Sequence, residues 1–223
     1  MRIPSLFLFG ALFLSIINPV SAQTADQLIV TWRAENLYPA DFMGKAMPTS
    51  GSPIQLSAEA VVAGKIVNLA TADISWFLDE TLLERGVGIK TTRFTARSSA
   101  TNNNFVRAQV KLGNKNLEGT VRIPVKQARV VVEIPILNKN LPADSEIQIS
   151  AVPYFFNAES IQNLIFNWII NNNRQKQIGN GELTLKIGKP QNGEQQKMTI
   201  TANVQNSLNP LEVAQDRGLF SIK

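Results

Sequence analysis

The sequence predicts an all-β protein made of two similar β-sandwich domains in tandem, and three patterns support this prediction. A nearly identical pentapeptide occurs twice, as IQLSA at 54–58 and as IQISA at 147–151. A tryptophan follows each copy at nearly the same distance, Trp76 in the first half and Trp168 in the second. Beyond the N-terminal apolar run, the helical spacing of apolar residues is nearly absent, which favours strands throughout.

Each pentapeptide has the pattern of a half-buried strand. Ile54, Leu56 and Ala58 alternate with polar residues, and the second copy repeats this alternation up to Ala151. A period of two places all the apolar side chains on one face of a sheet. The one helical feature that we expect is a single short turn within 158–166, before the strand that carries Trp168.

Further strand patterns follow each tryptophan in the same order. The matching pairs of segments are 88–96 with 181–188, 105–112 with 198–204, and 119–125 with 218–223. The shared order indicates a repeated domain of about 100 residues, which is a usual length for one β-sandwich.

The tryptophans predict the type of sandwich. A tryptophan on the third strand, buried between two sheets, is the core arrangement of immunoglobulin-like domains. We therefore expect Trp76 and Trp168 in the two cores. The chain has no cysteine, so small residues should take the positions where a disulfide often lies, with Ala58 and Ala151 as candidates. Facing alanines, Ala108 and Ala202, are the expected partners.

The domain boundaries follow from the ends of these patterns. Residues 1–22 carry Arg2, an apolar run and a small-residue cleavage site, and they predict a secretory signal peptide. The alternative is a retained anchor helix. We expect the first domain at 23–126 and the second at 127–223, joined so closely that they form a stiff, extended rod. No second apolar run is long enough to cross a bilayer, so no membrane span is expected after cleavage.

The composition argues against catalysis. The sequence has no histidine and no cysteine, which removes the commonest general base and the commonest metal ligands. We therefore predict a non-enzymatic protein with no catalytic residues, no cofactor and no metal. Asp79 and Glu80 could contribute to a calcium site, but a solvated hairpin turn is the favoured interpretation. Gly86 to Gly88 lack the lysine of a phosphate loop and indicate a bulge or hairpin.

The charge does not indicate a nucleic-acid partner. The net charge is +5 and the basic residues are spread over both halves, whereas nucleic-acid binders concentrate them. Arg93, Arg97, Arg107 and Lys111 could attract an anionic surface or a polysaccharide. Because their two strands should belong to opposite sheets, we do not expect one continuous patch.

The loop at 36–48 is the candidate contact site. Tyr38 and Phe42 lie between two predicted strands, and exposed aromatic residues in loops often anchor a partner. The alternative is that they close the end of the sandwich. The segment 153–160 has aromatic residues too. As the expected counterpart in the second half, it favours the closing role.

With these patterns described, each half resembles bacterial immunoglobulin-like or PKD-type extracellular domains. Ile74-Ser75-Trp76 and Phe166-Asn167-Trp168 stand where the PKD family has Tyr-x-Trp. The stretch 36–58 is similar to segments of uncharacterised secreted proteins of small-genome uncultured bacteria. The resemblance implies a location at the cell surface and supplies no catalytic residue.

Three functions remain open from the sequence. The first is a non-enzymatic secreted or cell-envelope protein, a structural, adhesive or assembly module. The second is a periplasmic chaperone-like protein for surface fibre assembly, and the third is a carbohydrate-binding accessory module. The expected location is secreted, periplasmic or at the cell surface, and the expected partner is an unidentified protein or glycan there.

Overall fold

The computed structural model describes residues 25–98, 100–136, 138–175, 179–190 and 196–223. The predicted signal peptide, residues 1–22, lies outside these described residues. Within them, the regular structure consists of strands and one 3-10 turn at Ile161–Asn163. The short turn predicted before the strand of Trp168 is therefore present.

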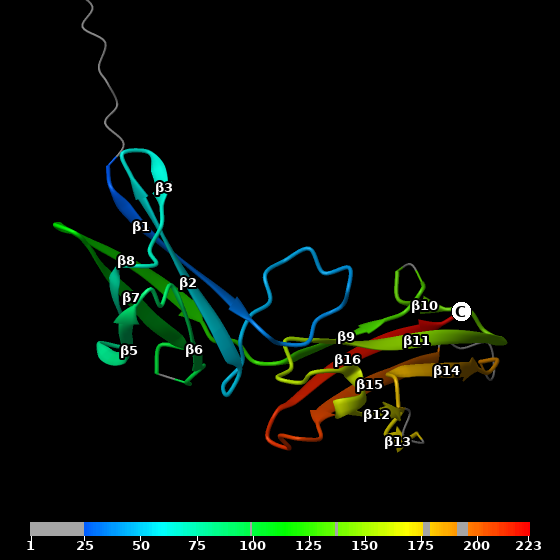
Figure 1. Cartoon of the computed structure of the whole chain (residues 1–223). Coiled ribbons are helices and arrows are strands. Elements are labelled where there is room, and N and C mark those ends of the chain that lie inside the picture. The colour runs from blue at the N-terminus through cyan, green and yellow to red at the C-terminus, as the bar shows by residue number, and fades with distance from the viewer. Residues whose placement is uncertain (1–24, 99, 137, 176–178, 191–195) are drawn as a thin grey trace, which may run out of the picture.

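The first domain consists of two antiparallel sheets (Figure 1). One sheet contains β1 (Gln27–Ala34), β2 (Pro53–Val62), β3 (Lys65–Val67) and β6 (Thr91–Thr95). The other contains, in spatial order, β5 (Thr81–Val87), β4 (Asp73–Leu78), β7 (Asn103–Leu112) and β8 (Lys115–Pro124).

The second domain repeats this arrangement. One sheet has the order β14 (Glu182–Ile187), β11 (Ser145–Tyr154) and β9 (Arg129–Glu133). The other has the order β10 (Asn140–Leu141), β16 (Val213–Ile222), β15 (Gln196–Asn206), β12 (Leu164–Ile170) and β13 (Asn173–Arg174). Among the described strands, only the short β10 pairs in parallel, with β16. The first domain has a different extra strand, β3, which pairs antiparallel with β2.

Backbone hydrogen bonds show how closely the two halves correspond. The amide of Ala58 donates to the carbonyl of Lys90, just before β6. In the second domain the amide of Ala151 donates to the carbonyl of Gly181, just before β14. Both alanines thus have the same place in the same strand of their sheets. The similar pentapeptides encode equivalent central strands.

Each domain has its own hydrophobic core between its sheets. Trp76 and Trp168 are fully buried, and each lies opposite an alanine on the neighbouring strand, Ala108 and Ala202. Ala58 and Ala151 are buried as well. Because a buried tryptophan lies on equivalent strands of both two-sheet domains, the fold is a pair of tandem immunoglobulin-like β-sandwiches. This confirms the fold class that the sequence predicts.

The two tryptophans differ in their hydrogen bonds. The indole N–H of Trp76 donates to the carbonyl of Ile89 at 2.9 Å. The indole N–H of Trp168 is buried and has no partner among the described residues. A buried donor without a partner is costly, so the two cores are not energetically equivalent.

The hairpin turn after β4 contains Asp79 and Glu80, both with positive φ. Asp79 accepts a hydrogen bond from the amide of Phe105, and Glu80 forms an ion pair with Arg107 at 2.6 Å. These contacts account for both carboxylates as parts of a turn. Among the described residues, no group of three or more carboxylates is positioned to hold a metal ion.

The basic residues of β6 and β7 lie on different sheets, as expected. Arg93 belongs to the sheet of β2, and Arg107 belongs to the sheet of β4. Arg107 also lies over the ring of Phe77 at 4.3 Å and is mostly buried. These cations therefore do not form a single patch.

An ion pair connects Asp26, just before β1, with Lys115, the first residue of β8, and leads to a testable prediction. The ammonium of Lys115 donates to Asp26, and with the amide of Ala63 it holds the pKa of Asp26 below its usual value. The stabilisation is therefore present above the unfolded-state pKa and is lost as the pH falls through the lowered one. We expect Lys115→Met to raise the pKa of Asp26 in an NMR titration of its carboxyl carbon. An unchanged titration would contradict this pairing.

Candidate functional site at the domain junction

The connection between the domains is short. β8 ends at Pro124 and β9 begins at Arg129. Within this connection, the amide of Lys126 donates to the carbonyl of Pro48. The connection is thus attached to the long segment between β1 and β2, residues 35–52, which we call the junction loop.

The junction loop leaves the first domain and joins the second (Figure 1). The amide of Leu37 donates to the carbonyl of Phe156 at 2.8 Å, and the amide of Phe155 donates to the carbonyl of Leu37 at 2.7 Å. The Leu37 side chain packs against the core of the second domain. A segment of the first domain therefore completes part of the second.

Aromatic side chains from both domains meet beside this pair of hydrogen bonds. The Phe42 ring centroid lies 5.7 Å from that of Tyr154 and 5.5 Å from that of Phe155, in edge-to-face geometry. Tyr38 contacts Phe42 at 5.9 Å and is 44% exposed. Edge-to-face pairs are a favourable arrangement of aromatic rings. Phe42 therefore binds the second domain of its own chain, whereas Tyr38 lies at the edge of the cluster.

The sequence interpretation of the segment 153–160 is wrong in one respect. The segment is not the counterpart of the loop at 36–48, because that loop follows β1, whereas 153–160 begins with the last residues of β11, the equivalent of β2. The two segments contact each other instead. The similarity of their composition reflects two surfaces that pack together, and pattern comparison within one chain cannot distinguish this from repetition.

The backbone of Phe155 is in an unusual conformation. Its φ is +64°, in the left-handed region that bulky residues rarely adopt. Such conformations persist only where the surrounding contacts determine them. Here the contacts are the hydrogen bond from its amide to Leu37, the bond that its carbonyl accepts from Asn36, and the ring of Phe42. The strain lies at the place where the two domains meet.

A buried set of polar side chains lies at the base of the junction loop. The amide nitrogen of Asn36 donates to Ser52 at 2.8 Å and to the carbonyl of Phe155 at 2.7 Å. Thr49 and Ser52 are within 3.0 Å of each other. All three polar residues are buried. Because buried polar groups need partners, these pairs favour one arrangement of the loop, and the Asn36 amide oxygen is the buried atom of the set without a partner among the described residues.

Glu212 connects the network to the second domain. Its carboxylate accepts hydrogen bonds from the Thr49 hydroxyl at 2.7 Å, from the Asn157 amide at 3.0 Å and from the Asn206 side chain at 2.8 Å. The residue is 9% exposed, and no ion pair to it occurs among the described residues. Donors from both domains thus bind the same carboxylate.

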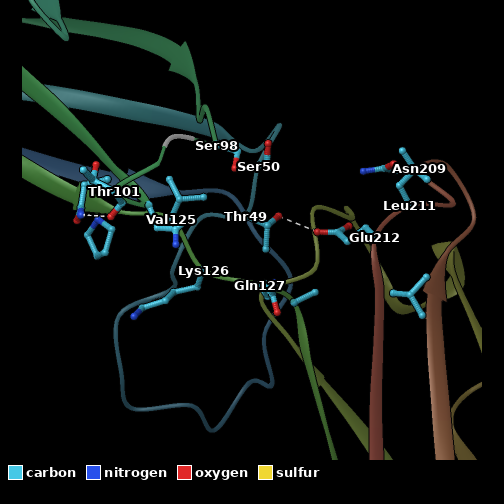
Figure 2. A pocket seen from close by; sticks show the side chains of 15 residues that line it. Thr49, Ser50, Ser98, Thr101, Val125, Lys126, Gln127, Asn209, Leu211 and Glu212 are labelled. Carbon is cyan, nitrogen blue, oxygen red and sulfur yellow. Dashed lines mark hydrogen bonds between the residues drawn. The ribbon is translucent and has the colours of Figure 1, made fainter.

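A crevice of about 810 Å³ lies beside the bond between Thr49 and Glu212 (Figure 2). Lys126 and Gln127 of the connection line one part, and Leu211 of the β15–β16 turn lines another. The lining is chiefly polar: it contains the hydroxyls of Thr49, Ser50 and Ser98, and Lys126 and Glu212 are its charged members.

Sequence reasoning identified Tyr38 and Phe42 but missed the residues that connect them to the second domain. Asn36, Thr49 and Glu212 lie in loops, where polar residues are normally solvated. The feature of the sequence that could have indicated this contact is the unusual length of the loop between β1 and β2.

Among the described residues, no helix is long and apolar enough to cross a bilayer.

Of the comparisons with known proteins, only the comparison with solved structures found similar proteins. No protein-family model matches the sequence, and no curated protein matches it significantly. The three N-terminal domains of the bacteriophage RB49 Highly Immunogenic Outer Capsid protein match at 10% identity and a TM-score of 0.45, covering 89% of this chain and 59% of that one.

Two further structures are similar in the same way. Fibronectin(III)-like modules of Clostridium thermocellum CbhA match at 13% identity and a TM-score of 0.31, covering 87% of this chain and 93% of theirs. A chimeric titin Z1Z2 carrying a KLER peptide from decorin matches at 13% identity and a TM-score of 0.36, covering 89% and 97%. The class of tandem immunoglobulin-like domains rests on the strand order and the buried tryptophans, not on these likenesses.

Proposed function

We propose that this protein is a non-enzymatic module that acts outside the cytoplasm as a stiff two-domain spacer, in a structural, adhesive or assembly role. Its domains would then be of the PKD-like extracellular type, and the predicted signal peptide would direct it to the envelope or beyond. The observation that carries the proposal is the junction loop, because it commits backbone hydrogen bonds of one domain to the other.

A stiff spacer needs more than a short connection. The four residues between β8 and β9 limit the distance between the domains but would still permit rotation. The junction loop adds a second attachment through Leu37 and Phe42, and Glu212 adds a third through Thr49. Attachments at separate places restrict rotation as well as separation. The same contacts oppose the opening and closing that a cleft enzyme would need.

The composition supports the non-enzymatic part of the proposal. Without histidine or cysteine, a nucleophile, a base and a charge stabiliser cannot be assigned together. The carboxylates that the sequence singled out, Asp79 and Glu80, are engaged in a hairpin turn and an ion pair. A role through position and contact fits this surface better than a chemical reaction.

The stiffness of the junction is tested by Phe42→Ala. We expect the loss of its ring contacts to weaken the attachment between the domains by about 2 kcal/mol, since each aromatic pair contributes about 0.5–1.5 kcal/mol. ¹⁵N relaxation should show one common tumbling time for both domains of the native protein and two faster ones for the variant. Both folded cores should be retained, because Phe42 belongs to neither.

Met43→Ala is the matched control. Met43 is the next residue in the same loop and is 97% exposed, so its removal should leave the common tumbling time unchanged. Independent tumbling of the two domains in the native protein would contradict the proposal.

A further inference from the structure

A second hollow, of about 530 Å³, lies over the outer face of the second domain. Ser150 and Val152 of β11 form its floor, and Leu37, Tyr38 and Pro39 of the junction loop form one side. Because one side comes from the first domain, the hollow exists only while the junction loop is docked. Its volume is within the range of small-ligand sites, about 300–1,000 Å³.

Polar side chains are arranged across the floor of this hollow. In the sheet register Ser150 pairs with Glu133 on one side and with Glu182 on the other. Directly paired residues lie on the same face, on strands about 4.8 Å apart, so the carboxylates flank the serine hydroxyl. Gln162 and Asn180 add amide groups to the lining. Several hydrogen-bond acceptors and donors therefore converge on one space.

Among the described residues, no cation forms an ion pair with Glu133 or Glu182. In the described parts of the chain, Glu182 accepts side-chain hydrogen bonds from two uncharged groups, Gln148 at 3.0 Å and Asn180 at 3.2 Å. Glu133 has no side-chain hydrogen bond or ion pair among the described residues. No lysine or arginine is among the residues that line the hollow. A phosphate, a uronate or another anion would thus be repelled.

The other surface of the hollow is apolar and aromatic. Tyr38 is partly exposed, and its ring contacts that of Phe42 at 5.9 Å with the planes tilted by 58°. Pro39, Pro153 and Ile161 extend the apolar surface. Because Phe42 is attached to the second domain, the Tyr38 ring is held in place before any ligand arrives. Such preorganisation reduces the entropy lost on binding.

From this arrangement we infer that the hollow is a binding site for a neutral saccharide. A pyranose has an apolar C–H face that stacks on an aromatic ring, and it has a rim of hydroxyls that hydrogen-bond to carboxylates and amides. The Tyr38 ring matches the first feature, and Glu133, Ser150 and Glu182 match the second. A purely apolar ligand would bury these polar groups without partners, at a cost.

This inference rests on the proposed fixed junction and specifies its partner as a glycan. Tyr38 then binds the ligand, and Phe42 is a positioning residue. The division of roles is testable because the two residues have different attachments: Tyr38 is 44% exposed and touches Phe42, whereas Phe42 contacts the second domain.

The test uses the full mature chain and immobilised probes of three kinds. These are neutral hexose and N-acetylhexosamine oligosaccharides, uronate-containing oligosaccharides, and oligolysine. We expect the native protein to bind neutral oligosaccharides in preference to the other probes. Tyr38→Ala should lower the affinity about tenfold or more, with an unchanged melting temperature, whereas Tyr38→Phe keeps the ring and should bind within about threefold of the native protein.

Two further variants separate the site from the junction. Glu182→Gln should weaken binding without changing the common tumbling time, and Met43→Ala should change neither. Absence of binding to every neutral oligosaccharide by a protein with coupled domains would overturn the saccharide site and leave the spacer role intact. Binding to oligolysine alone would overturn it too, by identifying a site for a basic peptide, as would neutral binding that Tyr38→Ala does not alter.

Discussion

Trp168→Ala is expected to destabilise the second domain by about 3–5 kcal/mol, which is the usual cost of removing a buried large aromatic side chain. Trp168 is fully buried in the middle of the second core, where β12 pairs with β15 opposite Ala202. Domains of this size have about 5–15 kcal/mol of stability in total, so the variant should be marginal.

The equivalent tryptophan of the first domain provides a matched comparison. Trp76→Phe should cost about 1 kcal/mol more than Trp168→Phe, because only Trp76 has an indole hydrogen bond to lose, that to the carbonyl of Ile89. Urea denaturation followed by near-ultraviolet circular dichroism would measure all these variants. A loss under about 1 kcal/mol for Trp168→Ala would be incompatible with a packed indole.

Glu212→Ala has the second large expected effect, a loss of about 3–5 kcal/mol together with the coupling between the domains. The change leaves the Thr49 hydroxyl, the Asn157 amide and the Asn206 side chain without their shared acceptor. Each buried donor without a partner costs about 1–3 kcal/mol. Differential scanning calorimetry should show one unfolding transition in the native protein and two in the variant, because the domains then unfold separately.

Conservative changes determine which part of the network matters. Glu212→Gln keeps one acceptor oxygen and should lose less than the alanine variant. Thr49→Val removes the bond to Glu212 that crosses between the domains, together with the contacts of the hydroxyl to Asn36 and Ser52. It should therefore reduce coupling while leaving the Asn157 and Asn206 contacts in place. Thr31→Val, at an exposed position of β1, is the control, because it makes the same change from threonine to valine away from the network. A single cooperative transition in Glu212→Ala would show that the domains are coupled elsewhere.

The alternation of apolar and polar residues was sufficient to predict the architecture of each domain. Ile54, Leu56 and Ala58 alternate with polar residues, and their side chains are fully buried in β2. A strand with one buried face permits a single register, because a shift of one residue would expose every apolar side chain. The repeated order of strands and the placement of Trp76 and Trp168 follow from this local rule, which acts within about ten residues.

The packing of the two domains against each other depends on contacts between residues far apart in the sequence, which the pattern of neighbouring residues does not predict. Leu37 pairs with Phe156, and Thr49 bonds to Glu212, across long separations in the chain. The polar residues involved have the composition of ordinary solvated loops. The aromatic residues of 153–160 indicated a repeat of the loop at 36–48, whereas in the structure the two segments contact each other. Their burial results from the tertiary structure alone.

The sequence by itself therefore determined that this chain forms two immunoglobulin-like sandwiches, because alternation and a central tryptophan act within each domain. The tertiary structure alone decided that the loop carrying Tyr38 and Phe42 docks on the second domain. That docking depends on the pairing of groups from distant segments, Leu37 with Phe156 above all. The free energy of such pairing comes from removing both partners from water at once, and neither segment reveals it separately.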